Sequence, residues 1–243
     1  MKRLIVLFTI VSFLSFGNTF AQINNGNFSL FGNILFPQRD FAHEGGIKTG
    51  SGFGIEYTYP INAPGVIWVT RIINYFLTTE WDNPIDSLGI SWVTSASLLK
   101  NDKDNSDEFP KEGICYYFPG PIIKGNYYNI PILIGFKLHG DVPHKISGYG
   151  MIQIGLNFIK PPSYLGEHYS GGTYETSFDF AKSFGFGIGG GLVFFDKFNV
   201  GIRFYNFGEA KIISKTKYDG KIEAMNEYKK SLSMLLVMFG IKL

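Results

Sequence analysis

Residues 51–59 form the run Ser-Gly-Phe-Gly-Ile-Glu-Tyr-Thr-Tyr, in which bulky apolar side chains alternate with small or polar ones. Successive side chains of an extended strand point to opposite faces, so the four bulky residues from Phe53 to Tyr59 share one face. Alternation of this kind is typical of a strand with one apolar face. The run therefore predicts a β-strand whose two faces meet different surroundings.

The same alternation recurs along the chain up to the C-terminal residue. Strands in soluble proteins average about five or six residues, whereas a tilted membrane-spanning strand needs about 9 to 11. The predicted segments are mostly of the longer kind, which favours a bilayer. We predict eight strands, at 28–36, 50–60, 66–78, 127–138, 147–158, 180–194, 198–207 and 231–243.

The connections between these strands alternate between short and long. Short turns follow the second, fourth and sixth predicted strands, and outer-membrane barrels have short periplasmic turns opposite long external loops. The pattern predicts an all-β fold, an eight-stranded antiparallel up-and-down transmembrane β-barrel. Its expected long external loops are 37–49, 79–126, 159–179 and 208–230.

The N-terminus has the pattern of an export signal. Two basic residues precede an apolar run from Leu4 to Phe16, and Thr19-Phe20-Ala21 follows. The apolar run is shorter than the roughly twenty residues that a membrane-spanning helix needs. We therefore predict a cleaved signal peptide over 1–21 and a single barrel domain over 22–243.

Composition argues against several classes of protein. The chain has 22 Lys and Arg against 20 Asp and Glu, and two of the basic residues lie in the signal peptide, so the mature protein is formally neutral. A nucleic-acid partner is not expected, since no clustered basic surplus is visible. The single cysteine excludes an intrachain disulfide. With 24 Phe and 14 Tyr, the chain has either a large soluble β core or apolar side chains facing lipid.

Charged and polar side chains tend to fall on the face opposite the apolar one. In a barrel that face lines the interior, where charges can pair, whereas Lys or Arg facing lipid at the midplane costs about 2 to 4 kcal/mol. An eight-stranded barrel is filled by its own side chains. The expected interior polar network comprises Glu56, Arg71, Lys137, Gln153 and Arg203.

Three motifs that could carry a binding site have simpler structural interpretations. The segment 185–190 has the glycine spacing of a dinucleotide-binding fingerprint, but both of its flanks are predicted strands. The acidic run 101–108 lacks the turn glycine and closing Glu of a calcium loop, so a solvated charge run is expected, with a weak divalent-ion site as the alternative. Of the four histidines, His139 and His144 lie on one predicted turn and could share a metal, but no third ligand lies nearby, so exposed turn histidines are expected. We expect no cofactor and no metal.

The predicted loop 79–126 carries an aromatic cluster beside the only cysteine. Loops of this length are usually functional or disordered. A buried, unreactive thiol is the plain interpretation, with a reactive external thiol as the alternative. The candidate contact surface for a partner is formed by Cys115, Tyr116, Tyr117 and Phe118.

Four segments together carry a resemblance to a known family: Thr19-Phe20-Ala21, Gly50 to Ile55, Asn129 to Leu133, and Met238 to Leu243. Through them the chain resembles the porin-family outer-membrane β-barrels of the PorT-like and OmpA-like kind. The resemblance implies residence in the cell outer membrane of a Gram-negative bacterium, contact with outer-membrane lipids, and insertion by the barrel-assembly machinery. Family members usually end in an aromatic residue, whereas this chain ends in Leu243.

Three functions of different classes are consistent with these patterns. The leading expectation is a structural or interaction barrel whose external loops contact an unidentified envelope or extracellular partner. A narrow channel or a component of a secretion assembly is the alternative. We expect no enzymatic activity, although a lipid-modifying site could form from His43, Glu44 and Ser51. The main rival architecture is a soluble lipocalin-type barrel, which commonly adds a helix.

Overall fold

The structure is a computed structural model that describes residues 26–38, 40–43, 47–61, 87–103, 122–142, 145–167 and 172–243. These residues form one antiparallel sheet and one short helix, α2, at Asp40–His43. No helix among them is long and apolar enough to cross a membrane. The strands are β1 Asn27–Pro37, β2 Ile47–Pro60, β3 Ser87–Lys103, β4 Ile122–Lys124, β5 Tyr127–Val142, β6 Ile146–Lys160, β7 Ser163–Glu167, β8 Thr173–Phe178, β9 Ala181–Phe194, β10 Phe198–Tyr218 and β11 Lys221–Lys242.

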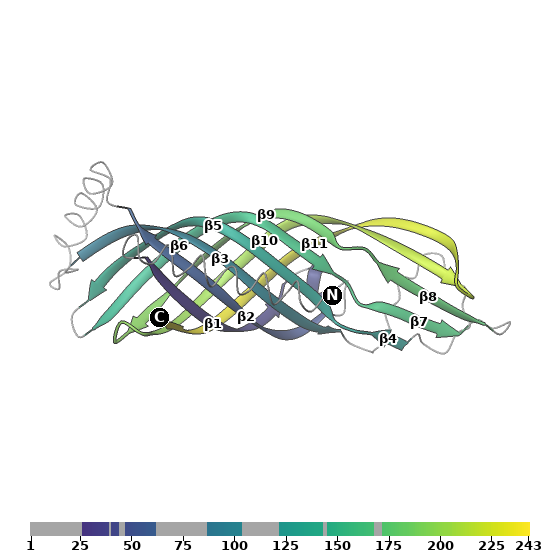
Figure 1. The fold of residues 1–243 in the computed structure, drawn as a ribbon, viewed down its shortest axis with the longest axis horizontal. Coiled ribbons are helices and arrows are strands. Elements are labelled where there is room, and N and C mark those ends of the chain that lie inside the picture. Colours follow the sequence, from purple (N-terminus) through teal and green to yellow (C-terminus); the bar gives the residue numbers. More distant parts are fainter. Residues whose placement is uncertain are drawn as a thin grey trace.

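Eight of the strands close into a ring, hereafter the ring (Figure 1). The order around it is β11, β1, β2, β3, β5, β6, β9 and β10, and β10 pairs back with β11. At the seam, Ser29 to Pro37 of β1 pair with Lys242 to Met234 of β11. Closure pairs the backbone of each strand on both sides within the ring, so no open sheet edge remains there.

The third strand of the ring is not where the sequence pattern placed it. The pattern predicted a strand at 66–78, which lies outside the described residues, and a loop at 79–126. Instead β3, at 87–103, pairs with β2 on one side and β5 on the other. Its outward face includes Thr94 and Ala96 while its inward face includes Val93. Apolar and polar residues therefore occur on both faces of β3, and the strand lacks the alternation by which the other strands were predicted.

A belt of exposed apolar side chains surrounds the ring and includes residues of all eight strands. Burial alternates along each strand, and among the described strands no outward position within this belt carries a charge. Phe53 and Phe184 are 63% and 64% exposed. We define the apolar belt as Leu30, Ile34, Phe53, Ile55, Trp92, Leu98, Ile132, Ile134, Phe136, Ile152, Ile154, Leu156, Phe184, Phe186, Ile188, Leu192, Val200, Ile202, Phe239 and Ile241.

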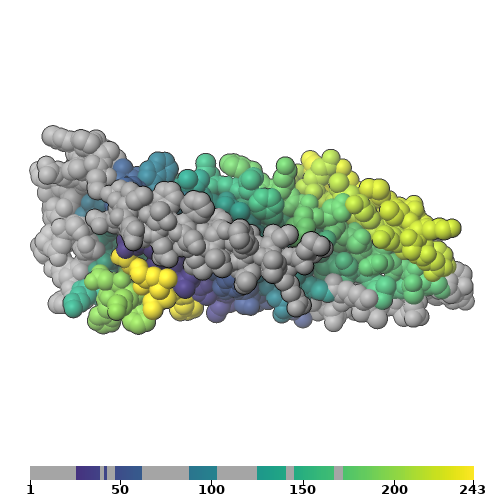
Figure 2. Space-filling model, in the orientation of Figure 1, coloured from purple at the N-terminus to yellow at the C-terminus, as the bar shows by residue number. Residues whose placement is uncertain are grey.

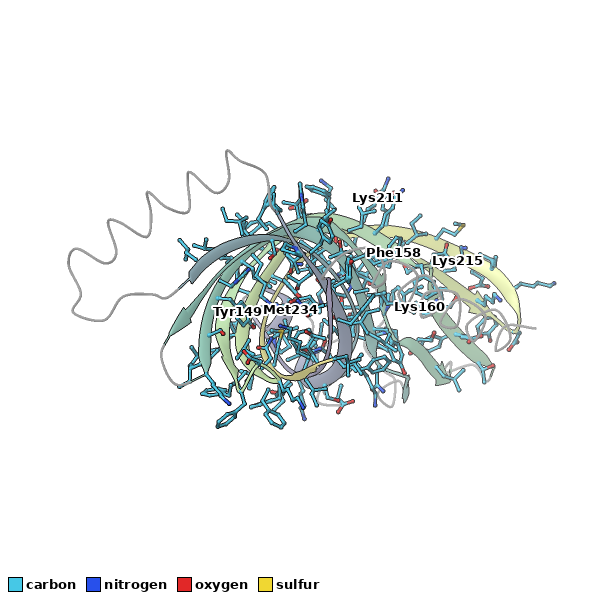
Figure 3. The ribbon with its side chains drawn as sticks, turned by 60° about the vertical axis from the view of Figure 1, so that its left-hand side comes forward. Tyr149, Phe158, Lys160, Lys211, Lys215 and Met234 are labelled. Atoms are coloured by element: carbon cyan, nitrogen blue, oxygen red, sulfur yellow. The ribbon has the colours of Figure 1, made fainter. Side chains whose placement is uncertain are left out.

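The interior of the ring is filled by side chains, and much of the filling is apolar. Tyr149 and Met234 both lie inside it (Figure 3). Leu35, Leu133 and Leu236 are at most 1% exposed and belong to one buried cluster with Met234. The alternation in the sequence predicted a small and polar interior face, and the structure adds this apolar core to it.

The glycine-rich segment 185–190 lies in the middle of β9, between β6 and β10. A Cβ atom on Gly185 would lie 2.1 Å from the carbonyl oxygen of Asn206, and one on Gly189 would lie 2.6 Å from that of Ile202. These glycines therefore allow β9 and β10 to approach closely where the sheet curves. No helix follows the segment, so it lacks the context of a dinucleotide site.

Beyond the ring the sheet continues as a separate arm, hereafter the extension (Figures 1 and 2). It consists of residues 207–232 of the β10–β11 hairpin together with β8, β7 and β4, which pair in that order outward from β10. The sequence predicted loops at 159–179 and 208–230. This prediction was wrong, because the two ranges contain β7, β8 and long parts of β10 and β11. The extension carries polar side chains on both faces, so the apolar alternation used to find strands is missing there.

Candidate functional site

A buried group of three charges crosses the interior of the ring, and its centre is Glu56 of β2. The carboxylate is fully buried, and its Oε1 accepts a hydrogen bond from Lys137 Nζ of β5 at 2.9 Å. Its Oε2 accepts a second hydrogen bond from Arg203 Nη2 of β10. A buried charge is tolerated only when it is paired. This charge triad therefore ties three strands that lie apart in the ring.

Tyrosine side chains contact both cations of the triad. Lys137 Nζ lies 4.1 Å from the centroid of the Tyr149 ring, and the Tyr149 hydroxyl donates to Asn199 Oδ1 at 2.9 Å. Arg203 Nη1 donates to the Tyr205 hydroxyl at 3.5 Å. A cation over an aromatic face gains about 2 kcal/mol when it is desolvated. These contacts fix the side chains of the triad in place inside the ring.

Amide side chains continue the polar interior towards the extension. Gln153 Nε2 donates to Ser95 Oγ at 3.0 Å, and Asn157 Nδ2 donates to Asn129 Oδ1 at 3.2 Å. Both polar atoms of the buried Asn33 side chain lack a hydrogen-bond partner among the described protein atoms. An unpaired buried polar atom costs about 1 to 3 kcal/mol. This layer is therefore less well satisfied than the charge triad.

Helix α2 covers the end of the ring that faces the extension. Its Phe41 is fully buried and contacts the ring of Tyr127 edge to face, with 6.0 Å between centroids. Lys230 of β11 is 7% exposed, and its Nζ lies 5.5 Å from the centroid of Tyr127 and 5.9 Å from that of Phe41. An aromatic and apolar layer therefore closes this end above the polar interior.

The structure brings together four of the five residues that the alternation assigned to the interior. Glu56, Lys137 and Arg203 form the charge triad, and Gln153 is buried one layer towards the extension. Arg71 lies outside the described residues, as do the candidate contact residues Cys115, Tyr116, Tyr117 and Phe118.

Sequence reasoning did not single out the aromatic and polar partners of the triad. Tyr149 and Asn199 lie in predicted strands and on the inward face, so continuing the alternation would have found them. His139 was expected on a turn, but it lies in β5, and its Nε2 is 3.1 Å from Ser91 Oγ. Ser91 is 2% exposed.

The described residues show no contact among the side chains considered for a lipid-modifying site. Ser51 lies on the outward face of β2, whereas α2, which ends at His43, covers the end of the ring through the buried Phe41. Glu44 lies outside the described residues. Among the described residues no group of three or more His, Cys, Asp or Glu side chains could hold a metal ion.

The extension has its own aromatic contacts, between strands β7, β8 and β11. The ring of Phe178 lies 5.6 Å from that of Tyr164 and 6.1 Å from that of Tyr228, both edge to face. Burial raises the pKa of Tyr164 to about 12. Burial and the neighbouring Tyr164 also raise the pKa of Tyr228. Both hydroxyls are therefore neutral over the physiological pH range.

No protein-family model matches the sequence, and no curated protein matches it. Among solved structures, the chain is similar to Neisserial surface protein A, with 10% identity and a TM-score of 0.43 over 90% of this chain and 97% of that one. It is similar at 10% identity to a major outer membrane protein from Thermus thermophilus, with a TM-score of 0.42 over 90% of this chain and 100% of the other. For the outer membrane protein OprG of Pseudomonas aeruginosa the identity is 10% and the TM-score 0.39, over 90% and 96%. A TM-score below 0.5 does not establish a shared fold, and the closed ring rests on the strand pairing of this chain itself.

Proposed function

We propose that the protein is an integral outer-membrane β-barrel with a sealed interior, and that its extension is a contact surface outside the membrane. One observation carries the proposal: an uncharged apolar belt surrounds a ring whose interior is filled by its own side chains. This combination is typical of small transmembrane barrels, which show apolar residues to lipid and polar residues to the inside.

The apolar belt supports a membrane rather than an aqueous environment. Soluble monomeric proteins rarely expose contiguous apolar patches larger than a few hundred Å². Here exposed Leu, Ile, Phe and Trp side chains occur on every strand of the ring. Because all ring strands are paired on both sides, the backbone also meets the requirement that hydrocarbon imposes. A lipocalin-type soluble barrel would instead bury its apolar face inside.

The ends of the ring support an orientation across the outer membrane. The turn between β9 and β10, at 195–197, and the C-terminal Leu243 lie at the end opposite the extension (Figure 1). Outer-membrane barrels keep short turns on the periplasmic side and long segments outside. The extension then lies outside the cell. We further infer a cleaved signal peptide over 1–21 from the N-terminal pattern, and a barrel of the OmpA-like or PorT-like porin family from the sequence resemblance.

The charge triad and the apolar core support a structural or interaction role over a channel. Glu56 and Leu35 are fully buried, and Arg203 is 2% exposed. Purified protein in planar lipid bilayers is expected to give no steady ion conductance. Sustained conductance in the absence of an applied denaturant would overturn the sealed interior and favour the narrow-channel alternative.

The contact-surface part of the proposal needs its own test. Replacing residues 211–227 by a short glycine-containing turn removes much of the extension and leaves every ring strand complete. We expect this variant to reach the outer membrane with an intact ring and to lose the cross-linked partner that the unmodified protein retains in whole cells. If the same partner is captured by both proteins, the contact surface lies elsewhere.

A further inference from the structure

Lysine side chains gather on one side of the ring, at the border between the apolar belt and the extension. Lys100 of β3 pairs with Tyr128 of β5, and Tyr128 pairs with Lys160 of β6, so the three lie in one cross-strand row. Lys182 of β9 pairs with Phe158, two residues from Lys160 on the same face of the sheet. We name these four residues, Lys100, Tyr128, Lys160 and Lys182, the lysine row.

The row lies beyond the apolar belt on all four strands and adjoins it directly on β3 and β9. The next outward residue towards the belt is Leu98 on β3 and Phe184 on β9, which are 36% and 64% exposed. Figure 3 shows Phe158 and Lys160 near the junction of the ring and the extension. If the belt lies in hydrocarbon, the lysines therefore lie at the depth of the lipid headgroups. Long cationic side chains at this depth commonly reach towards headgroup phosphates.

The carboxylates near the row are already engaged by other lysines. Asp179 pairs with Lys215 at 2.6 Å, and Glu209 pairs with Lys229 at 3.4 Å. Lys182 has no ion-pair partner among the described residues, and neither has Lys160. The positive charge of these two ammonium groups is therefore not neutralised by the described part of the protein.

Lys160 is held in place and still has donors to offer. Its Nζ donates to the carbonyl oxygen of Phe178 and lies 5.3 Å from the centroid of the Phe180 ring. An ammonium group has three donors, so two remain. Diagonal neighbours in a sheet are about 7 to 8 Å apart, which allows one phosphate to accept from both Lys160 and Lys182. Tyr128, 37% exposed, supplies an aromatic side chain at the same level.

From this geometry we propose that the lysine row binds the phosphate of a lipid headgroup in the leaflet that adjoins the extension. The proposal rests on the membrane insertion proposed above. It goes further in assigning a side of the ring, a ligand class and two principal residues, Lys160 and Lys182. Lys100 is a weaker contributor because Asp102 lies 3.6 Å from its Nζ.

The test uses the mature chain folded in detergent, with bound lipid counted by native mass spectrometry. The probe is phosphatidic acid, and phosphatidylcholine with the same acyl chains is the zwitterionic comparison. The K160Q/K182Q variant is compared with the matched control K217Q/K221Q, which removes the same charge from the far end of the hairpin. Each lysine near a membrane surface contributes about fivefold to the affinity for anionic lipid, so the pair contributes about 25-fold.

We expect the unmodified protein and the control to bind phosphatidic acid about 25-fold more tightly than K160Q/K182Q, with little difference for phosphatidylcholine. Equal binding by all three proteins would overturn the site. Displacement by inorganic phosphate at the same concentration as the lipid would overturn the lipid as its ligand. Migration on a denaturing gel before and after boiling is recorded for each protein, so loss of the closed ring, which would sink the proposed function, is distinguished from loss of the headgroup site alone.

Discussion

Strands β10 and β11 run through both the ring and the extension, and their side chains change where they pass from one to the other. Inside the ring, Tyr205 and Leu236 are buried and Ile202 and Phe239 face outward. In the extension the same two strands are joined by exposed ion pairs, such as Lys211 to Glu227 at 2.7 Å. A register irregularity between Asn206 and Glu209 marks the border.

The comparison shows that one pair of strands gives charged side chains two different surroundings. At the level of the apolar belt the charges point inward and are buried, as at Arg203, whereas charges such as Lys211 and Glu227 of the extension are exposed. Removing one partner of a buried ion pair lowers the free energy of unfolding by several kcal/mol, whereas an exposed ion pair contributes about 0 to 1 kcal/mol. The same substitution should therefore have different consequences in the two regions.

The largest contrast is expected for removal of one carboxylate in each region. Glu56→Gln leaves Lys137 and Arg203 buried without their anion and should lower the free energy of unfolding by about 3 to 5 kcal/mol. Glu227→Gln, which removes the exposed partner of Lys211, should lower it by less than about 1 kcal/mol. Urea unfolding in lipid vesicles measures both. Similar losses for the two variants would contradict the buried triad.

The second-largest contrast in stability is expected when a lysine is introduced on the outer surface of each region. Ile134→Lys puts a charge in the apolar belt and should destabilise the folded protein in a bilayer by about 2 to 4 kcal/mol. Met225→Lys, on the exposed part of the extension, should change it by no more than about 0.5 kcal/mol. The folded fraction in vesicles is measured for each. A belt that accepts the lysine without loss does not face hydrocarbon.

Alkaline pH should loosen the extension before the ring. The pKa of Tyr164 is raised from 10 to about 12 in the folded state, so this tyrosine keeps its proton when the unfolded chain has lost it. Its stabilising contribution is complete below pH 10 and is lost as the pH rises towards 12. The protection of β7 and β8 against hydrogen exchange, expressed relative to the base-catalysed intrinsic rate, should fall over that interval, and Tyr164→Phe should remove much of the fall. Unchanged protection up to about pH 12 would show that Tyr164 is not buried.

The smallest contrast in stability is expected for a buried amide side chain without described hydrogen-bond partners. Asn33→Leu removes two buried polar atoms without described hydrogen bonds and should stabilise the ring by about 1 kcal/mol. Asn226→Leu, at an exposed position of the extension, should be close to neutral. The unfolding midpoints of the two variants in urea provide the comparison. Marked destabilisation by Asn33→Leu would show that its side chain is satisfied in solution.

Alternation in the sequence located much of the ring. The predicted strands at 28–36, 50–60, 127–138, 147–158, 180–194, 198–207 and 231–243 are confirmed as parts of β1, β2, β5, β6, β9, β10 and β11. In these segments bulky side chains occupy most of the outward positions, and that signal is strong. The strand β3 was missed because Thr94 and Ala96 interrupt its outward face. The ends of β10 and β11 were missed because polar residues occur on both of their faces, such as Lys211 outward and Ser214 inward, and interrupt the alternation.

The inward positions of Glu56, Lys137 and Arg203 follow from the same alternation, but their contact does not. Glu56 and Arg203 are 147 positions apart in the chain. Their meeting depends on the order of strands around the ring and on the register of each pair, and alternation within one strand contains neither. The aromatic closure by Phe41 of α2 was also beyond this reasoning, since a four-residue helix leaves no periodic signal.

The central claim is a closed ring whose apolar belt lies in the outer membrane. It is tested most directly by fractionating cells that express the full chain and comparing unheated and boiled samples of each fraction on a denaturing gel. We predict that the protein is found in the outer-membrane fraction and that the unheated band migrates differently from the boiled one. A protein that stays soluble after export, with the same migration before and after boiling, would contradict the account.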